Sequence, residues 1–329
     1  MPLNIAGTVI PGLDLPISPL VLGTMTFGDT VDAAGASAMV DAALDAGITT
    51  IDTANAYAGG ATEEILAPLL AGRRDRVVLA SKAGMPHPDA GDHPPLSAAA
   101  LRTSLEGSLR RLNTERIDLY YLHKPDRETP LEETLITIAE FVRAGKIGAL
   151  GVSNFAAWQI SELNQVADAV GAPRPVVAQQ LYNLVARRLE EEYLEFASTT
   201  GLHTMVYNPL GGGLLTGKHS FTETPGEGRF GSSNLSAMYK ERYWDQQLFA
   251  AIAALGIIAD EARIPLVELS FRWLISQSGV GSILLGGSRT TQLEANIRAA
   301  ARGPLPDDVL AACDAVGRTL RGPMPAYNR

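Results

Sequence analysis

The sequence predicts a single α/β domain folded as an eight-stranded (β/α)8 barrel, also called a TIM barrel, and two patterns carry this prediction. Eight short aliphatic or β-branched runs recur along the 329 residues, each apolar on both faces, as in strands buried within a parallel sheet. Segments with helical periodicity separate them, and such alternation indicates right-handed crossovers closed into a barrel. The expected strands are Leu20–Gly23, Thr49–Asp52, Val77–Ser81, Ile117–Leu122, Ile147–Gly151, Val176–Gln179, His203–Tyr207 and Ser282–Leu285.

Three of the segments between these runs have the clearest helical pattern. They are Ala36–Ala46, Ser97–Leu112 and Leu131–Ala144, and in each of them apolar residues recur three or four positions apart. In the second segment three leucines follow one another at intervals of four, which places them on one face of a helix. These segments are therefore expected to pack as helices against the outside of the barrel.

Two segments fall outside the repeating pattern. Residues 3–17 are expected to form a small hairpin before the first barrel strand. The segment Lys218–Tyr243, after the seventh strand, is rich in Gly, Ser, Thr and Pro and has no clear period. Because long irregular connections in compact domains usually serve function, we expect a structureless lid or binding loop there. No domain linker interrupts the pattern, so residues 1–329 are interpreted as one domain.

The composition excludes several classes of function. The net charge of -9 and pI of about 5.1 disfavour nucleic acid and anionic membrane surfaces as partners. No apolar run approaches the ~20 residues that span a bilayer. The first residues lack the basic start and apolar stretch of a signal peptide, and a single cysteine, Cys313, fits a reducing compartment, so a cytoplasmic location is expected. The spacings of His87, His93, His203 and His219 suggest no metal site.

Polar side chains follow three consecutive strands of the predicted barrel. The second strand ends at Asp52 and is followed by Tyr57, the third leads to Lys82, and the fourth to His123. Because active sites of such barrels lie at the carboxyl ends of the strands, these four side chains are expected at one pocket mouth.

Together the four groups suit the reduction of a carbonyl compound. A carbonyl that accepts hydride becomes an alkoxide and needs a proton, but tyrosine, with a pKa of ~10, is a poor acid. An ammonium near Tyr57 is expected to lower the pKa of its phenol, and Asp52 would keep Lys82 charged. An N–H of His123 could polarise the carbonyl. Each residue also has an ordinary structural interpretation, as a helix cap, surface cation, packing aromatic or strand-end histidine.

Several ordered motifs resemble those of the aldo-keto reductase family. They are Ile51-Asp52-Thr53-Ala54-Asn55-Ala56-Tyr57, Ser81-Lys82, Leu122-His123-Lys124-Pro125-Asp126 and Gly151-Val152-Ser153-Asn154-Phe155, and the likeness covers nearly the whole chain. This resemblance implies a barrel enzyme that reduces aldehydes or ketones to alcohols with NADP(H), a small-molecule carbonyl compound as substrate, and the four residues above as catalytic groups.

The resemblance also implies which residues hold the cofactor. Ser153, Asn154 and Gln179 look like the residues that bind the nicotinamide amide in relatives, and Tyr207 like the one that stacks on its ring. Glycines in the run that follows Tyr207 permit close backbone approach to the pyrophosphate. The full expected set is Thr24, Met25, Asp52, Ser153, Asn154, Gln179, Tyr207, Asn208, Pro209, Leu210, Gly212, Leu214, Gly217, Lys218, Arg229, Gly286, Ser288, Arg289, Gln292 and Asn296.

The segment after the eighth strand opens a helix, and helix N-termini favour phosphate. Ser288, Arg289 and Gln292 could hold a 2′-phosphate there, which would favour NADPH. The alternative is an ordinary helix capped by Ser288 or Thr290.

Within the family, the chain is most similar to the aflatoxin-aldehyde and succinic-semialdehyde reductase subfamily. Gly228-Arg229-Phe230 and Tyr239-Lys240-Glu241-Arg242-Tyr243-Trp244 resemble that group's long loop, and Arg329 its terminal arginine. Arg242 and Arg329, with His123, are therefore expected to contact substrate and to favour aldehydes that bear a carboxylate. The tryptophan that this group often carries just after the catalytic lysine is absent, since Gly84-Met85-Pro86-His87 stands there.

Two other functions remain open at this point. The chain could be a cofactor-binding regulatory barrel without significant turnover, similar to the potassium-channel β-subunits, or an unrelated barrel enzyme such as a phosphate-handling isomerase. The intact set of four catalytic residues argues against the first, and the second has no use for Tyr57 beside Lys82. A homodimer is an open assembly state, and the sequence leaves the physiological substrate and the direction of the reaction undetermined.

Overall fold

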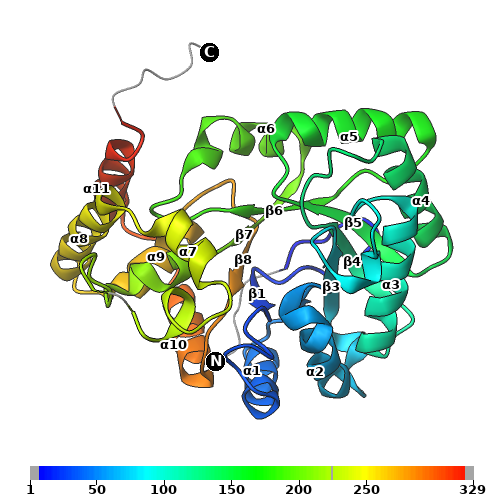
Figure 1. The fold of residues 1–329 in the computed structure, drawn as a ribbon. Helices are drawn as coiled ribbons and strands as arrows, with labels where there is room; N and C mark the ends of the chain where they lie inside the picture. The colour runs from blue at the N-terminus through cyan, green and yellow to red at the C-terminus, as the bar shows by residue number, and fades with distance from the viewer. Residues whose placement is uncertain (1–6, 224, 323–329) are drawn as a thin grey trace.

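The predicted barrel is confirmed in the computed structural model, which describes residues 7–223 and 225–322 (Figure 1). Eight parallel strands pair in chain order, and the last pairs with the first to close the barrel. The strands are β1 (Leu20–Gly23), β2 (Thr50–Asp52), β3 (Val78–Ala83), β4 (Ile117–Leu122), β5 (Ile147–Ser153), β6 (Val177–Leu181), β7 (His203–Tyr207) and β8 (Ser282–Leu285).

Helices surround the barrel, and the connection from β7 to β8 carries three of them. The α-helices of the described residues are α1 (Ala33–Asp45), α2 (Ala61–Leu70), α3 (Ala98–Leu112), α4 (Leu131–Arg143), α5 (Ala157–Val170), α6 (Tyr193–Thr200), α7 (Ser236–Tyr243), α8 (Gln246–Glu261), α9 (Leu266–Ile275), α10 (Thr290–Ala300) and α11 (Asp307–Thr319). Short 3₁₀ helices add η1 (Tyr57–Gly60), η2 (Arg74–Arg76), η3 (Pro88–Ala90), η4 (Arg188–Glu191), η5 (Gly211–Thr216) and η6 (Gly228–Phe230). None of the helices in the described residues is long and apolar enough to cross a membrane.

The ends of the elements differ from the sequence prediction in places where capping or pairing decides them. Helix α1 begins three residues earlier than predicted because the Asp32 side chain accepts a hydrogen bond from the Gly35 N–H at 2.8 Å. Strands β3, β5 and β6 run two residues further than predicted, since the ladder continues past the last apolar residue. The hairpin predicted over residues 3–17 lies partly outside the described residues, and within them it is a single antiparallel bridge between Thr8 and Ile17.

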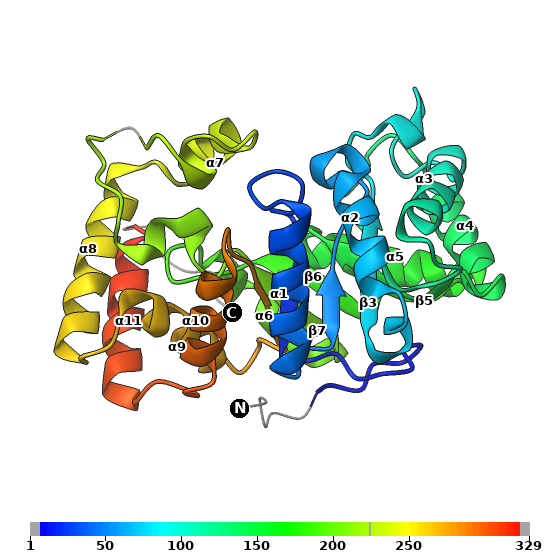
Figure 2. The ribbon, with the colours of Figure 1, turned by 90° about the horizontal axis from the view of Figure 1, so that it is seen from below.

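The long loop predicted over Lys218–Tyr243 is present, but it is not structureless throughout. This segment contains η6 and the two-turn helix α7, and α7 buries Tyr239 and Tyr243. Tyr243 stacks on Tyr239 with ring centroids 6.3 Å apart. Figure 2 shows α7 on the side of the molecule toward which β3 points, beside the loop that follows β1. The described residues of this segment therefore form a lid over the carboxyl ends of the strands.

Buried side chains form two layers. The larger cluster lies between the helices and the outer surface of the strands. A smaller cluster fills the barrel itself and includes Leu119, Tyr121 and Met205. Because the interior is packed, the barrel has no pore, and its reactive groups must lie at the ends of the strands.

A buried ion-pair network ties together the elements around the second and third strands. The Arg111 guanidinium on α3 donates to Glu63 at 2.9 Å and to Asp89 at 2.8 Å. Glu63, on α2, is fully buried and also accepts from the Ser81 hydroxyl at 2.6 Å. One cation thus connects α2, α3 and the segment that follows β3.

We predict that Arg111→Ala lowers the free energy of unfolding by about 3–5 kcal/mol, because it leaves two carboxylates without their cation in a mostly buried site. Urea denaturation measures the change. The matched control on the same helix is Arg102→Ala, which removes an exposed pair with Glu140 and is expected to cost about 0–1 kcal/mol. Equal losses in the two variants would contradict a buried network.

Candidate active site

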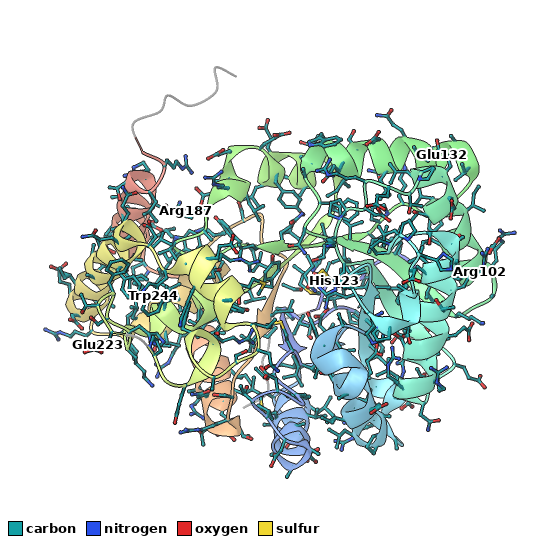
Figure 3. All side chains as sticks on the ribbon, viewed as in Figure 1. Arg102, His123, Glu132, Arg187, Glu223 and Trp244 are labelled. Carbon is teal, nitrogen blue, oxygen red and sulfur yellow. The ribbon has the colours of Figure 1, made fainter. Side chains whose placement is uncertain are left out.

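The barrel brings the four predicted catalytic side chains together at its mouth. Asp52 ends β2, Lys82 lies in β3, His123 directly follows β4, and Tyr57 begins η1. Figure 3 shows His123 near the middle of the view onto the barrel, away from the rim where Trp244 and Arg187 lie. This arrangement follows from parallel strands, whose carboxyl ends all open on the same side.

The Lys82 ammonium is the centre of the cluster, and its three protons have three partners. It donates to Asp52 Oδ1 at 2.5 Å, to the Thr53 carbonyl at 2.7 Å and to the Tyr57 hydroxyl at 3.2 Å. Both charged side chains are almost fully inaccessible to solvent, at 0% for Lys82 and 1% for Asp52. The second carboxylate oxygen of Asp52 accepts from Gln179 Nε2 at 2.8 Å. The ammonium is thus held beside the Tyr57 phenol by a buried counter-ion that is itself fixed.

The ionisation of Tyr57 differs from the expectation drawn from the sequence. Desolvation raises the pKa of the phenol, and the opposing effect of Lys82 does not outweigh it, so the net pKa is raised rather than lowered. Burial alone would lower the pKa of Lys82, but Asp52 and Tyr57 together raise it. Burial raises the pKa of Asp52 against the influence of Lys82. At neutral pH, Tyr57 therefore retains its proton beside a charged ammonium.

His123 is held neutral next to this cluster. Burial, then Lys82, then Lys124, lower the pKa of its imidazole to about 3. Its ring meets the Tyr57 ring edge-on, with centroids 5.9 Å apart, and its Nδ1 is buried without a partner among the described residues. A neutral imidazole can offer an N–H to a substrate oxygen, but it cannot supply a proton as imidazolium near pH 7.

The residues expected to hold the nicotinamide amide lie together at the ends of β5, β6 and β7. The Ser153 hydroxyl donates to the Gln179 carbonyl at 3.0 Å, and Asn154 Nδ2 donates to Ser153 Oγ at 3.1 Å. The Tyr207 hydroxyl donates to Asn154 Oδ1 at 2.6 Å. Asn154 takes a left-handed conformation, with φ of 63°, which turns its amide toward this group. Gln179 differs from the expectation in one respect, because its amide N–H is already engaged with Asp52.

The glycine-rich run after β7 forms η5 and wraps closely under the lid. Asn208 begins it with a positive φ of 58°, followed by buried Pro209 and partly buried Leu210. A Cβ on Gly212 would lie 2.5 Å from the Tyr239 ring, so only glycine fits against the lid there. Leu214 is buried, Gly217 ends η5, and Lys218 is exposed.

The N-terminus of α10 has no side-chain cap. Its N-cap residue is Arg289, not Ser288 or Thr290, and the Arg289 side chain makes no capping hydrogen bond. The Gln292 side chain instead folds back and accepts from the Ser288 N–H and hydroxyl, both at 3.0 Å. Asn296 donates to the carbonyl of Gly286 at 3.2 Å, which fixes the end of β8 against the helix. This terminus therefore presents N–H groups and an exposed guanidinium.

The lid is fastened to the rim on both sides of the mouth. Arg229 donates to the Tyr239 hydroxyl at 2.7 Å and lies 3.8 Å from the sulfur of Met25, in the loop after β1. The Tyr239 hydroxyl donates to Asn208 Oδ1 at 3.1 Å. On the β1 side, Thr24 donates to the Asp52 carbonyl at 2.9 Å and anchors that loop. The role of Tyr239 in fastening the lid was not predicted, and its spacing of four from Tyr243, on which it stacks, is the signal that could have indicated it.

A second hydrogen bond that holds the lid was not predicted from the sequence either. The Ser233 hydroxyl of the lid donates to Asp29 Oδ2, in the loop after β1, at 3.0 Å. No local sequence pattern joins two residues so far apart in the chain. Met25 and Asp29 thus bind the lid from the β1 side, while Asn208 binds it from β7.

Of the two arginines expected at the substrate, the structure describes one. Arg242, on α7, lies 6.0 Å from the Tyr239 ring and close enough to Tyr207 to lower the pKa of its phenol, although burial raises that pKa overall to about 12. Arg242 itself is exposed. Arg329 lies outside the described residues. Among the described residues, no group of three or more His, Cys, Asp or Glu side chains could hold a metal ion.

Sequence comparisons match this chain to one family and to several known proteins. The sequence profile of the Aldo/keto reductase family matches residues 19–318. Aflatoxin B1 aldehyde reductase member 2 of Rattus norvegicus is 36% identical over 330 residues, covering 95% of this chain and 89% of that protein. Aldo-keto reductase family 7 member A3 of Homo sapiens is 36% identical, covering 94% and 96% respectively. A probable voltage-gated potassium channel subunit beta of Oryza sativa is 34% identical, covering 87% and 88%.

Proposed function

Because this chain belongs to the aldo/keto reductase family, we propose that it reduces aldehydes or ketones to alcohols with NADPH, using Tyr57 as the proton donor. The observation that carries the proposal is the buried Lys82 ammonium, bonded at once to Asp52 and to the Tyr57 hydroxyl. A packing tyrosine would have no need of a desolvated cation 3.2 Å from its oxygen. The proposal places the enzyme in the cytoplasm, as a monomer or a homodimer.

The residues at the mouth fit a nicotinamide dinucleotide. Asn208 Nδ2 is a buried amide donor with no protein partner among the described residues, beside the positive-φ glycines of η5. Ser153, Asn154 and Gln179 would hold the carboxamide, and Tyr207 would stack on the ring. The uncapped end of α10, with Arg289, would hold the 2′-phosphate, because exposed N–H groups and a guanidinium favour a dianion. When bound, the reduced cofactor supplies the hydride that converts the carbonyl carbon into an alcohol carbon.

The protein's own residues complete the reaction. His123 and the Tyr57 hydroxyl would orient the carbonyl oxygen, and a neutral imidazole suits this because it donates a hydrogen bond without competing for charge. Tyr57 gives its proton to the oxygen as negative charge develops there, and Lys82 stabilises the phenolate that remains. Asp52 keeps the ammonium charged and in place. The lid excludes water from the mouth by covering it.

A cofactor-binding regulatory barrel is the other function to consider, since one relative is a probable potassium channel subunit beta. The alternative predicts cofactor binding without appreciable turnover. The relation to the two reductases and the desolvated Lys82–Tyr57 contact support an enzyme instead.

Tyr57→Phe is expected to lower the rate of aldehyde reduction by at least about a hundredfold, because it removes the general acid but little of the packing. NADPH oxidation is followed by absorbance, and cofactor affinity by fluorescence quenching. We expect the affinity to stay near that of the wild type. A variant that kept more than about a tenth of the rate would require another acid.

The wild type is expected to bind NADPH more tightly than NADH, and Arg289→Ala to weaken NADPH binding by about tenfold or more while leaving NADH binding unchanged, since a charge-assisted contact to phosphate is lost. Fluorescence titration with each cofactor measures this. Arg298→Ala, near the other end of α10, is the control and should affect neither cofactor. Equal affinity of the wild type for both cofactors would refute the assignment.

We further propose that the site favours aldehydes bearing a carboxylate, since the Arg242 guanidinium lies exposed near Tyr207 over the mouth. A guanidinium binds a carboxylate through two parallel hydrogen bonds. Arg329 would add a second cation if the terminal residues reach the mouth.

For Arg242→Ala we expect the ratio of kcat/KM for 2-carboxybenzaldehyde to that for benzaldehyde to fall by about tenfold, because a charged hydrogen bond is lost. Lys240→Ala removes a charge from the same helix and should leave the ratio unchanged. A chain truncated before Arg329 tests the terminal arginine in the same assay. A wild type without preference for the carboxylate would rule out both assignments.

A further inference from the structure

A buried aromatic ring lies directly below the Lys82 ammonium, and none of the interactions described so far uses it. Lys82 on β3 is the register partner of Tyr121 on β4, and Tyr121 is the register partner of Gly151 on β5. Register partners in a parallel sheet direct their side chains to the same face. Lys82 and Tyr121 therefore both point into the barrel, and the Lys82 Nζ lies 5.7 Å from the centroid of the Tyr121 ring.

The neighbouring position explains why the ring can lie there. A Cβ on Gly151 would be 2.5 Å from Tyr121 Cδ1 and 2.6 Å from Cε1, which is closer than real contacts allow. The φ of Gly151 is not positive, so the backbone does not demand glycine here. The missing side chain is what makes room for the ring.

The hydroxyl at the far end of the ring lies in the same packed cluster, beside Met205 and Gln179. Tyr121 is fully buried in the inner barrel cluster, and its hydroxyl donates to the sulfur of Met205 at 3.5 Å. Thioether sulfur is a weak acceptor, so this bond contributes little to holding the hydroxyl. Burial raises the pKa of Tyr121 well above its usual value, and the phenol stays uncharged. The contact with Lys82 is made by the ring, and the hydroxyl lies against Met205 and Gln179 instead.

All three ammonium protons of Lys82 are already used by Asp52, Thr53 and Tyr57. A ring without Lys82 Nζ as a hydrogen-bond partner can therefore contribute only through its face, and the Nζ lies 5.7 Å from the Tyr121 centroid. An aromatic face stabilises a cation without accepting a proton from it. The ring therefore leaves the three hydrogen bonds of Lys82 undisturbed.

We propose that Tyr121 is a positioning residue for the reaction: its ring, seated over Gly151, holds the Lys82 ammonium against the Tyr57 hydroxyl. This inference rests on the proposed function, in which Lys82 assists proton transfer from Tyr57. Tyr121 acts through Lys82 and contacts neither the cofactor nor the substrate.

The first test separates the ring from the hydroxyl. Tyr121→Phe keeps the ring and is expected to retain the wild-type kcat. Tyr121→Leu removes it and is expected to lower kcat by about tenfold, the effect of losing a desolvated cation–π contact. Tyr121→Met, which fills space flexibly, is the second variant without a ring and should match the leucine variant. NADPH affinity should stay the same throughout. Loss of activity in the phenylalanine variant, or full activity in both variants without a ring, overturns the proposal.

The second test uses the contact with Gly151. Gly151→Ala should lower kcat in the wild-type background, because the new methyl group displaces the ring. In the Tyr121→Leu background, Gly151→Ala should lower kcat no further. Equal losses in both backgrounds would show that Gly151 does not act through the ring.

A general loss of barrel packing is the competing explanation, and Leu119 provides the control. Leu119 is fully buried on the same strand and in the same inner cluster, two residues before Tyr121. Leu119→Ala should lower the melting temperature while leaving kcat unchanged. If it lowers kcat as much as Tyr121→Leu, the role of Tyr121 is packing alone.

Crystal structures without cofactor give a readout that does not depend on turnover. In Tyr121→Leu, the distance from Lys82 Nζ to the Tyr57 oxygen should exceed the ~3.5 Å limit of a hydrogen bond, and in Tyr121→Phe it should not. An unmoved ammonium in Tyr121→Leu overturns the proposal. A wild type without reductase activity would refute the proposed function instead, and the comparison of structures would still decide whether Tyr121 positions Lys82.

Discussion

The constraint on which the rest of this structure depends is the burial of one ammonium group inside a barrel. A lone buried cation is costly unless a counter-ion and hydrogen-bond acceptors replace the water that it loses. Here Asp52 supplies the charge and the Thr53 carbonyl and Tyr57 hydroxyl supply the remaining acceptors. All three partners come from one strand end and the turn after it. The relative positions of β2, β3 and the turn that bears Tyr57 must therefore allow all three hydrogen bonds of one side chain, Lys82.

A second constraint comes from the long connection between β7 and β8, which lies over the mouth of the barrel. Its helix α7 is short, and short helices gain stability from tertiary contacts rather than from their own hydrogen bonds. Tyr239 provides such contacts, because it closes on Gly212 below and receives the Arg229 hydrogen bond beside it. Asp29 binds the opposite edge through Ser233. A cofactor lying between β1 and β7 would be covered by a lid that is anchored at both ends, and its release would require these contacts to open.

The sequence predicted the strands well because each is an uninterrupted apolar run, and it predicted the four catalytic candidates because each follows such a run. The prediction from the sequence failed where contacts between distant residues decide the structure. Helix α7 buries only two aromatic residues in a polar segment, which gives no period, and the Asp52 contact with Gln179 joins residues 127 apart. The sign of the shift in the pKa of Tyr57 was also wrong, since the sequence displays the nearby cation but not the desolvation that outweighs it.

The proposed catalytic groups and the loop after β3 lie on different parts of this fold but share one support, Arg111. Asp52, Tyr57 and Lys82 depend on β2, β3 and the turn after β2, whereas Gly84-Met85-Pro86-His87 follows β3. His87 accepts a hydrogen bond from the Asp89 N–H, and Asp89 in turn binds Arg111. Arg111 also holds Glu63 on the helix that follows the turn bearing Tyr57. One largely buried guanidinium thus braces both the loop after β3 and the helix that follows the turn bearing Tyr57, so a change in that loop would reach the turn through Arg111.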